Sequence, residues 1–256
     1  MKTLIVNADD CNLTPGVTAA ILAAHDTGIV SSTTFMANLP IRPAEIRAIK
    51  KRKALGVGVH LNVTLGRPVS RPSQVPSLTD AEGKFRRRGD QLAKLPLKKD
   101  LVKEYAAQVL LFRHVFERLP THLDTHHQMH DHPLYLEALI AVAKRFRLPV
   151  RRSALMKSAK SGAPVYKGVK TVDRVLGDLD PKGFWRKASL ETVLRKLPEG
   201  LNEVMCHPGR IDRDLKALSS FTHGRDKERD LFRSSVWKKK LPEWGIRLAN
   251  YGVCYT

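Results

Sequence analysis

A chain of 256 residues, of which 42% are hydrophobic and 27% charged, can bury one substantial core, and we expect a single domain over residues 1–256. No stretch approaches the ~18 consecutive apolar residues of a membrane helix. The apolar N-terminal run is interrupted at Asp9 and Asp10, too early for a signal peptide. The sequence therefore predicts a cytoplasmic protein without membrane insertion. Its three scattered cysteines predict neither a disulfide framework nor a structural zinc site.

The charge balance is strongly basic. The chain has 45 Lys and Arg residues against 25 Asp and Glu residues, which gives a formal net charge of +20. Such a charge is compatible with a nucleic acid, an anionic membrane surface or an acidic substrate. The basic runs at residues 86–88, 98–99 and 238–240 are separated and lack the interleaved aromatic residues of a single-strand binding groove. We therefore interpret them as solvated surface and expect no nucleic-acid partner.

Short runs rich in Val, Ile and Leu alternate with segments of helical period, a rhythm typical of a mostly parallel sheet with crossover helices. Together with the length, this rhythm predicts the α/β class and a TIM-like βα barrel with about seven mostly parallel strands, one short of the full eight. The predicted strands span residues 3–7, 32–38, 57–62, 122–125, 149–153, 203–206 and 246–250.

Helical segments separate these strands. The first begins at Thr14, a suitable N-cap, and ends at Gly28, where glycine suits a helix C-terminus. Two segments rich in Pro, Gly and basic residues, 64–97 and 154–185, interrupt the alternation, and we place both at the mouth of the barrel. Further helices are predicted over residues 101–119, from Pro133 onward, and from Asp226, as N-cap, toward Lys240.

Polar residues that can bind a metal or transfer a proton stand at the ends of four predicted strands. In a βα barrel these ends open on one face, where such enzymes place their active sites, so we expect residues far apart in sequence to converge. The residues are Asp9 and Asp10 after the first strand, His60 in the third, Asp124, His126 and His127 at the fourth, and His207 after the sixth.

Taken singly, each of these residues also has a structural explanation. The aspartate pair suits a turn or a helix cap, and His60 suits a hydrogen-bonded core histidine. His207 precedes Pro208, which favours an extended strand end. The segment 126–130 reads His-His-Gln-Met-His, and histidine clusters of this density commonly bind metal. Their joint placement at the strand ends favours a functional site.

One carboxylate and two imidazoles from three strands make a ligand set that leaves positions open for water and substrate. We therefore expect one divalent metal ion, Mg²⁺ or Zn²⁺, bound by Asp10, His60 and His126. Asp9 would take a proton from water as general base, and His207 would protonate the leaving group as general acid.

A second group of residues is expected to support this site. Asp124 is a candidate for orienting a ligand imidazole through its other ring nitrogen. His127, His130 and Arg151 are candidates for the same supporting role or for contact with substrate.

At these residues the sequence resembles the YdjC-like (ChbG-type) carbohydrate deacetylases, in the order and spacing of four motifs. The motifs are Asn-Ala-Asp-Asp at 7–10, Gly-Val-Gly-Val-His-Leu-Asn at 56–62, Thr-His-Leu-Asp-Thr-His-His at 121–127 and Cys-His-Pro-Gly at 206–209. The resemblance covers nearly the whole chain. It implies a distorted TIM-like barrel, a divalent metal, a homodimer, and hydrolysis of the N-acetyl group of a chitooligosaccharide or related acetylated amino sugar.

By position, the resemblance implies that Asp10, His60 and His126 are metal ligands and that Asp9 and His207 occupy the acid/base positions. Two departures stand out, and they bear on the pocket. Cys11 and Asn12 stand where the family usually has Phe-Gly, and Asn can adopt the left-handed backbone that Gly supplies, while the lost aromatic ring alters the pocket floor. Gln128 stands where a third histidine often follows the doublet.

Two other functions are compatible with these residues. A metal-dependent phosphoesterase could use an Asp/His site on a barrel, although we find no second carboxylate-rich cluster for a paired metal. A basic nucleic-acid-binding protein would need the histidines to be structural, and the sequence has no helix-turn-helix, zinc-finger or aromatic RNA-binding signature.

Overall fold

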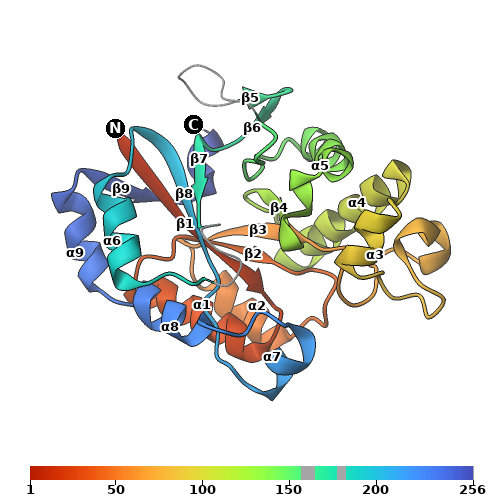
Figure 1. The fold of residues 1–256 in the computed structure, drawn as a ribbon, viewed down its shortest axis with the longest axis horizontal. Helices are drawn as coiled ribbons and strands as arrows, with labels where there is room; N and C mark the ends of the chain where they lie inside the picture. Colours follow the sequence, from red (N-terminus) through yellow and green to blue (C-terminus); the bar gives the residue numbers. More distant parts are fainter. Residues whose placement is uncertain (157–164, 178–182, 256) are drawn as a thin grey trace.

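The computed structural model describes the chain apart from residues 157–164, 178–182 and 256. Its centre is a seven-stranded sheet in the order β4-β3-β2-β1-β8-β7, and β9 pairs with the first half of β1 (Figure 1). All these pairs are parallel, and helices line the outside of the curled sheet. The α/β class and the distorted barrel are thereby confirmed. The strands are β1 (Lys2–Cys11), β2 (Ser32–Phe35), β3 (Gly56–Leu61), β4 (Leu123–Thr125), β7 (Arg174–Leu176), β8 (Gly200–Cys206) and β9 (Ile246–Ala249).

Beyond β4, single bridges take the place of a further strand. Leu123 of β4 pairs with Val150, and Val150 pairs with Thr171, both in parallel. The predicted strand at 149–153 is therefore wrong, because only Val150 bridges. Just beyond it the chain turns away, since Ser153 Oγ donates to the carbonyl of His130 at 2.9 Å.

The sequence predicts that segment 154–185 interrupts the alternation of strands and helices, and this is wrong for its described part. It contains β7 and a small antiparallel hairpin of β5 (Val165–Tyr166) and β6 (Val169–Lys170). The remainder of that prediction, residues 157–164 and 178–182, lies outside the described residues.

The helices follow the predicted order with two corrections at their ends. Thr14 caps α1 as predicted, its Oγ1 accepting from the Val17 amide at 3.2 Å. The helix predicted to reach residue 119 ends at Phe116, because Glu117 adopts a left-handed backbone with φ 58°. The helices are α1 (Pro15–Thr27), α2 (Pro43–Lys50), α3 (Arg88–Ala93), α4 (Lys98–Phe116), α5 (Pro133–Phe146), α6 (Lys187–Arg195), α7 (Arg213–Leu218), α8 (Arg225–Phe232) and α9 (Val236–Glu243).

The helix predicted from Asp226 toward Lys240 is two helices, α8 and α9, and its N-cap is Gly224. The break has a tertiary cause. The carbonyl of Phe232 accepts from the amide of Ile29, just after α1, at 3.0 Å. This close approach requires Gly28, since a Cβ there would lie 1.8 Å from the Phe232 carbonyl oxygen.

The connection between β3 and α4 is held in place by buried carboxylates of α4. Glu104 accepts from the backbone amides of Val69 and Ser70 at 2.9 Å each, and Asp100 accepts from the Ser77 amide at 3.0 Å. These bonds stabilise a long segment whose own structure consists of α3, short 3₁₀ turns at Pro72–Gln74 and Pro76–Leu78, and one antiparallel bridge between Thr79 and Phe85. Among the described residues, no helix combines the length and apolar character needed to cross a bilayer.

Candidate metal centre

The end of β1 contains an irregularity that turns two consecutive carboxylates toward the same place. Ala8 pairs with Thr33 and Cys11 with Phe35, so β1 has one residue more than β2 over this interval. Asp10 lies in this bulge with a left-handed backbone, φ 66°. Neighbouring side chains of a regular strand point to opposite faces, and an extra residue breaks that alternation. As a result, Asp9 and Asp10 each have an oxygen within 4.8 Å of a His60 ring nitrogen.

Three predicted ligands converge as a compact triangle. Asp10 Oδ1 lies 3.3 Å from His60 Nε2 and 3.2 Å from His126 Nδ1, and the two nitrogens are 3.3 Å apart. Ligand atoms ~2.0–2.2 Å from a single ion lie about this far from one another. Asp10 Oδ1 is buried and has no hydrogen-bond partner among the described residues. A divalent ion would satisfy that oxygen, so the residues fit a metal.

The second oxygen of Asp10 is already engaged. Oδ2 accepts from Arg225 Nη2 at 2.7 Å, and the guanidinium is fixed in turn by its Nε, which donates to the Phe221 carbonyl at 2.7 Å. Burial raises the pKa of Asp10, but Arg225, His126 and His60 outweigh burial and hold this pKa well below its usual value. Asp10 is therefore ionised, with Oδ2 bound to Arg225 and with Oδ1 facing the two histidine nitrogens.

His60 is oriented by Asp124, which lies opposite it on β4. Its Nδ1 lies 2.7 Å from Asp124 Oδ1, so Nε2 faces Asp10. Thr34 donates to the other Asp124 oxygen at 3.0 Å. Burial alone would lower the pKa of His60, but Asp124 and Asp10 reverse this and raise it to about 10. In the metal-free protein, the two carboxylates thus favour the protonated imidazole of His60.

The histidine cluster after β4 is divided by its backbone. His126 enters the triangle, while His127, with φ 56°, stacks on the His126 ring at 3.8 Å. His127 Nδ1 lies 3.0 Å from Thr64 Oγ1, and burial together with His126 lowers its pKa to about 3. His130 is fully buried and pairs through Nδ1 with Thr125 Oγ1 at 2.6 Å. The structure therefore places His127 beside the triangle and His130 within the core.

Arg151 lies at the centre of a buried ionic network. It donates to both oxygens of Asp9, at 2.6 and 2.7 Å, and it contacts Asp124 at 2.9 Å and Glu203 at 2.7 Å. Glu203 also accepts a hydrogen bond from the Tyr251 hydroxyl. Burial raises the pKa of Glu203 even though Arg151 opposes this. Buried charges require such pairing.

The sequence predicts no second carboxylate-rich cluster that could hold a paired metal, and this network tests that prediction. The structure does bring Asp9 and Asp124 together beside His60, as a further group of potential metal ligands. The space between their oxygens is filled by the Arg151 guanidinium. We therefore correct the expectation: the cluster exists, but it holds a cationic side chain.

His207 approaches Asp9 from the β8 side. Its Nε2 lies 3.9 Å from Asp9 Oδ2, and its ring packs edge-on against Phe221, with 5.2 Å between centroids. The backbone amide of His207 donates to Glu228 at 2.6 Å, which fixes the strand end. The ring is about one-quarter exposed, unlike the three residues of the triangle. His207 thus lies where solvent and the buried centre meet.

The structure also shows Cys11 and Asn12, which stand where the family usually has Phe-Gly. Asn12 has φ 76°, which confirms that this position requires the left-handed backbone. Cys11 is fully buried, and burial raises the pKa of its thiol to about 12. A thiol that stays protonated is a poor metal ligand.

Four residues of this centre were not singled out from the sequence: Glu203, Arg225, Glu228 and Tyr251. Glu203 could have been identified from the sequence, because a single charged residue inside an apolar strand is usually buried only with a partner of opposite charge. Arg225 could not have been identified, because it stands in a highly charged stretch of the sequence where a buried arginine cannot be told from a solvated one. Its burial is decided by α8 packing near α1, which local sequence does not show.

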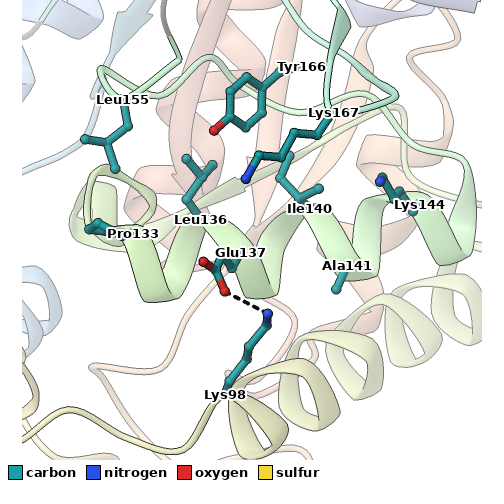
Figure 2. Close-up of a pocket in the computed structure, with 10 residues that line it drawn as sticks. All are labelled: Lys98, Pro133, Leu136, Glu137, Ile140, Ala141, Lys144, Leu155, Tyr166 and Lys167. Carbon is teal, nitrogen blue, oxygen red and sulfur yellow. Dashed lines mark hydrogen bonds and ion pairs between the residues drawn. The ribbon is translucent and has the colours of Figure 1, made fainter.

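Hollows of the described structure lie in different places relative to this centre. One, of about 400 Å³, is lined by Thr64 and the connection that follows β3. Another, of about 510 Å³, lies on the outer face of α5 between the start of α4 and the β5–β6 hairpin (Figure 2). Its one carboxylate, Glu137, is paired with Lys98 at 2.7 Å, and it contains none of the predicted site residues. The first hollow is linked to the centre through Thr64, whose Oγ1 lies 3.0 Å from His127 Nδ1.

Comparison with known proteins agrees with this geometry. A family model described as YdjC-like protein matches residues 3–243. A carbohydrate deacetylase of Geobacillus stearothermophilus is 34% identical over 251 residues, which cover 98% of this chain and 97% of the relative. Another, of Enterococcus faecalis, is 35% identical over 264 residues and covers 98% of this chain and 97% of the relative.

Solved structures give the same result. A protein of Enterococcus faecalis V583, described provisionally as a cellobiose-phosphate cleavage protein, superposes with a TM-score of 0.86 at 33% identity over 98% of both chains. A family 4 acetyl xylan esterase of Clostridium thermocellum, solved with a cobalt ion, has a TM-score of 0.52 at 11% identity over 99% of this chain and 90% of that one, a likeness of fold. The matched family model and the full-length relatives together show that this chain belongs to the YdjC-like family.

Proposed function

We propose that this chain is a metal-dependent hydrolase that removes the N-acetyl group from an acetylated amino sugar. The observation that carries the proposal is the buried triangle of Asp10, His60 and His126, with Asp9 directly beside it. Full-length relatives named carbohydrate deacetylase support the reaction and the substrate class. No observation favours a phosphoesterase, since the second carboxylate cluster surrounds Arg151.

The ligand set would hold one divalent ion through one oxygen and two nitrogens. When bound, Mg²⁺ or Zn²⁺ would polarise the amide carbonyl and make water more acidic. Mixed oxygen and nitrogen ligation suits several divalent ions, and zinc often occupies sites of this kind. A cobalt ion in the clostridial esterase of similar fold supports the presence of a divalent ion.

The remaining residues would move the protons. Asp9 takes a proton from the attacking water at Oδ2, the oxygen that faces His207. The water oxygen bonds to the acetyl carbon, the C–N bond breaks, and His207 gives a proton to the departing amine nitrogen. Arg151 keeps the Asp9 carboxylate in a fixed orientation through two hydrogen bonds. The products are acetate and the free amino sugar.

The direct test is acetate release from a panel of acetylated amino sugars, including chitooligosaccharides, with and without a chelator. We expect release that stops on chelation and returns when metal is added. Phosphate release from a generic ester, without acetate release, would instead support a phosphoesterase. A homodimer and a cytoplasmic location stay predictions, and the three buried, unpaired cysteines are compatible with a reducing compartment.

Asp9→Asn is expected to retain the metal and to lose turnover. The amide cannot accept the water proton, and general-base catalysis typically contributes ~10²–10⁴-fold. The measurement is kcat for acetate release together with metal content per chain. Asp230→Asn, at an exposed carboxylate, is the control and should behave as wild type. Unchanged turnover in Asp9→Asn would remove Asp9 from the mechanism.

Metal affinity is expected to rise with pH. His60 has a pKa of about 10 in the metal-free protein, and its Nε2 proton must leave before that nitrogen can bind an ion. Below pH 10 each ion should therefore release one proton from His60, and the association constant should rise roughly tenfold per pH unit. Asp10 should release no proton on metal binding near neutral pH, because its pKa is held well below its usual value. Calorimetry in buffers of different ionisation enthalpy measures the released proton, and an affinity independent of pH between 6 and 8 would contradict this assignment.

A further inference from the structure

The hollow on the outer face of α5 is lined by one complete stripe of that helix. We call it the α5 pocket; its volume of about 510 Å³ is within the ~300–1,000 Å³ typical of small-molecule sites. Figure 2 shows α5 as its floor, the start of α4 on one side and the β5–β6 hairpin on the other. The lining residues of α5 stand three or four positions apart, the spacing of one helical face. They are Pro133, Leu136, Glu137, Ile140, Ala141 and Lys144.

The middle of this floor is apolar. Leu136 and Ile140 are 4% and 5% exposed, although α5 packs its opposite face, with Ala138 and Val142, into the core. The hairpin adds the half-buried ring of Tyr166 to the wall of the pocket. An apolar group that entered would therefore be removed from water on more than one side, which favours binding.

The cations of the pocket outnumber its carboxylates. Among the described residues that line it, three are lysines and one is a glutamate. Glu137 is paired with Lys98 at 2.7 Å, so these two charges balance. The ammonium groups of Lys144 and Lys167 have no hydrogen bond or ion pair with another described residue, and that of Lys167 lies 5.5 Å from the centre of the Tyr166 ring. An anionic group could pair with both lysines without displacing an existing partner.

Lys167 stands in the pocket wall despite an unfavourable backbone. Tyr166 pairs with Val169, so Lys167 and Gly168 form a two-residue hairpin turn, with φ 47° and 80°. Such turns favour Asn-Gly, because most L-residues are strained at positive φ. The stability of the turn therefore does not explain a lysine at this position. Lys144 packs against the same turn, since a Cβ on Gly168 would lie 3.7 Å from Lys144 Cε.

We propose that the α5 pocket binds a small soluble anion that carries an apolar chain or ring, of the class of the alkyl phosphates. The apolar part lies on Leu136, Ile140 and Tyr166, and the anionic group pairs with Lys144 and Lys167. In Figure 2 the Lys167 side chain extends from the hairpin toward the apolar residues of α5. The pocket shares no residue with the metal centre, so this binding requires no metal and is independent of the proposed deacetylation.

The test measures binding of octyl phosphate, as the probe, to the full chain by titration calorimetry. The Kd should be the same with metal bound and after chelation. Butyl and ethyl phosphate should bind more weakly, by about fourfold for each methylene removed, because each buried methylene contributes to binding. Octanol and inorganic phosphate should each bind at least tenfold more weakly than octyl phosphate, since each lacks one half of the contacts.

Substitutions of the charged residues locate the probe. Lys144→Gln and Lys167→Asn should each raise the Kd about tenfold, because a hydrogen bond to a charged group is lost. Asn suits the turn, so Lys167→Asn should keep at least the Tm of wild type, which separates a binding role from a structural one. Glu137→Gln should lower the Kd about fivefold, because Lys98 becomes free to attract the anion. Lys103→Gln, at an exposed lysine of α4 outside the pocket, is the control.

Contrary results would each overturn a defined part of the proposal. Absence of octyl phosphate binding to wild type would overturn the site, as would an unchanged Kd in both Lys144→Gln and Lys167→Asn. Binding that disappeared on chelation would locate the probe at the metal centre. Octanol bound as tightly as octyl phosphate would overturn the anionic class. Sedimentation with phosphatidic acid vesicles that is lost in Lys167→Asn, by a chain that does not bind octyl phosphate, would indicate a membrane-facing surface instead.

Discussion

His126→Ala is expected to lose both bound metal and acetate release. His126 Nδ1 is one corner of the triangle, and only Asp10 Oδ1 and His60 Nε2 would remain to hold an ion. Removing a residue that only hydrogen-bonds to a metal ligand typically lowers metal affinity or activity ~10–100-fold. Removing a ligand itself should therefore lower metal affinity further. Metal content per chain after gel filtration and the rate of acetate release measure the two effects.

The control for this variant is His114→Ala, at an exposed histidine on α4 that should change neither quantity. The circular dichroism of His126→Ala should match that of metal-free wild type, which separates loss of the ion from loss of the fold. A variant that kept one ion per chain and full activity would show that the ligand set is wrong.

Arg151→Met is expected to be the most destabilising single substitution at the centre. The guanidinium is fully buried, and removing it leaves three buried carboxylates, Asp9, Asp124 and Glu203, without their cation. Breaking a buried pair by deleting one partner costs about 3–5 kcal/mol. The free energy of unfolding from urea denaturation measures this loss. Activity should fall as well, because Asp9 loses its two hydrogen bonds from the guanidinium and keeps the one from Asn7.

Arg151→Lys provides the graded comparison. It keeps the positive charge but lacks the planar fork that reaches several carboxylates at once, so we expect an intermediate free energy of unfolding. Arg145→Met, at an exposed position on α5, should leave the free energy of unfolding within ~0.5 kcal/mol of wild type. If Arg151→Met were as stable as Arg145→Met, the carboxylates would have to be protonated or hydrated in its absence.

The sequence predicts those features of the fold that depend on local pattern. The apolar runs that became β1, β3 and β8 are buried and locally distinct, so the polar residues at their ends could be assigned to one face. The cap at Thr14 and the left-handed Asn12 likewise follow from properties of single residues.

Features that depend on distant contacts were not predictable in this way. The break between α8 and α9 comes from hydrogen bonds to the end of α1, about two hundred residues earlier, as when Thr27 Oγ1 donates to the Arg233 carbonyl. Val150 forms a bridge instead of a strand because Ser153 bonds to a neighbouring turn. Arg225 and Tyr251 reach the centre from the last part of the chain, and no local pattern marks them as buried.

The left-handed backbone at Asp10 restricts which residue types can stand at this position. Most L-residues pay roughly 1–2 kcal/mol in this conformation, whereas Asp and Asn adopt it more readily. A change to Glu or Cys would therefore alter the donor atom and strain the turn at the same time. At the proposed metal site, the main chain thus favours an oxygen donor at this corner, and a switch of metal selectivity would require remodelling the bulge as well as the side chain.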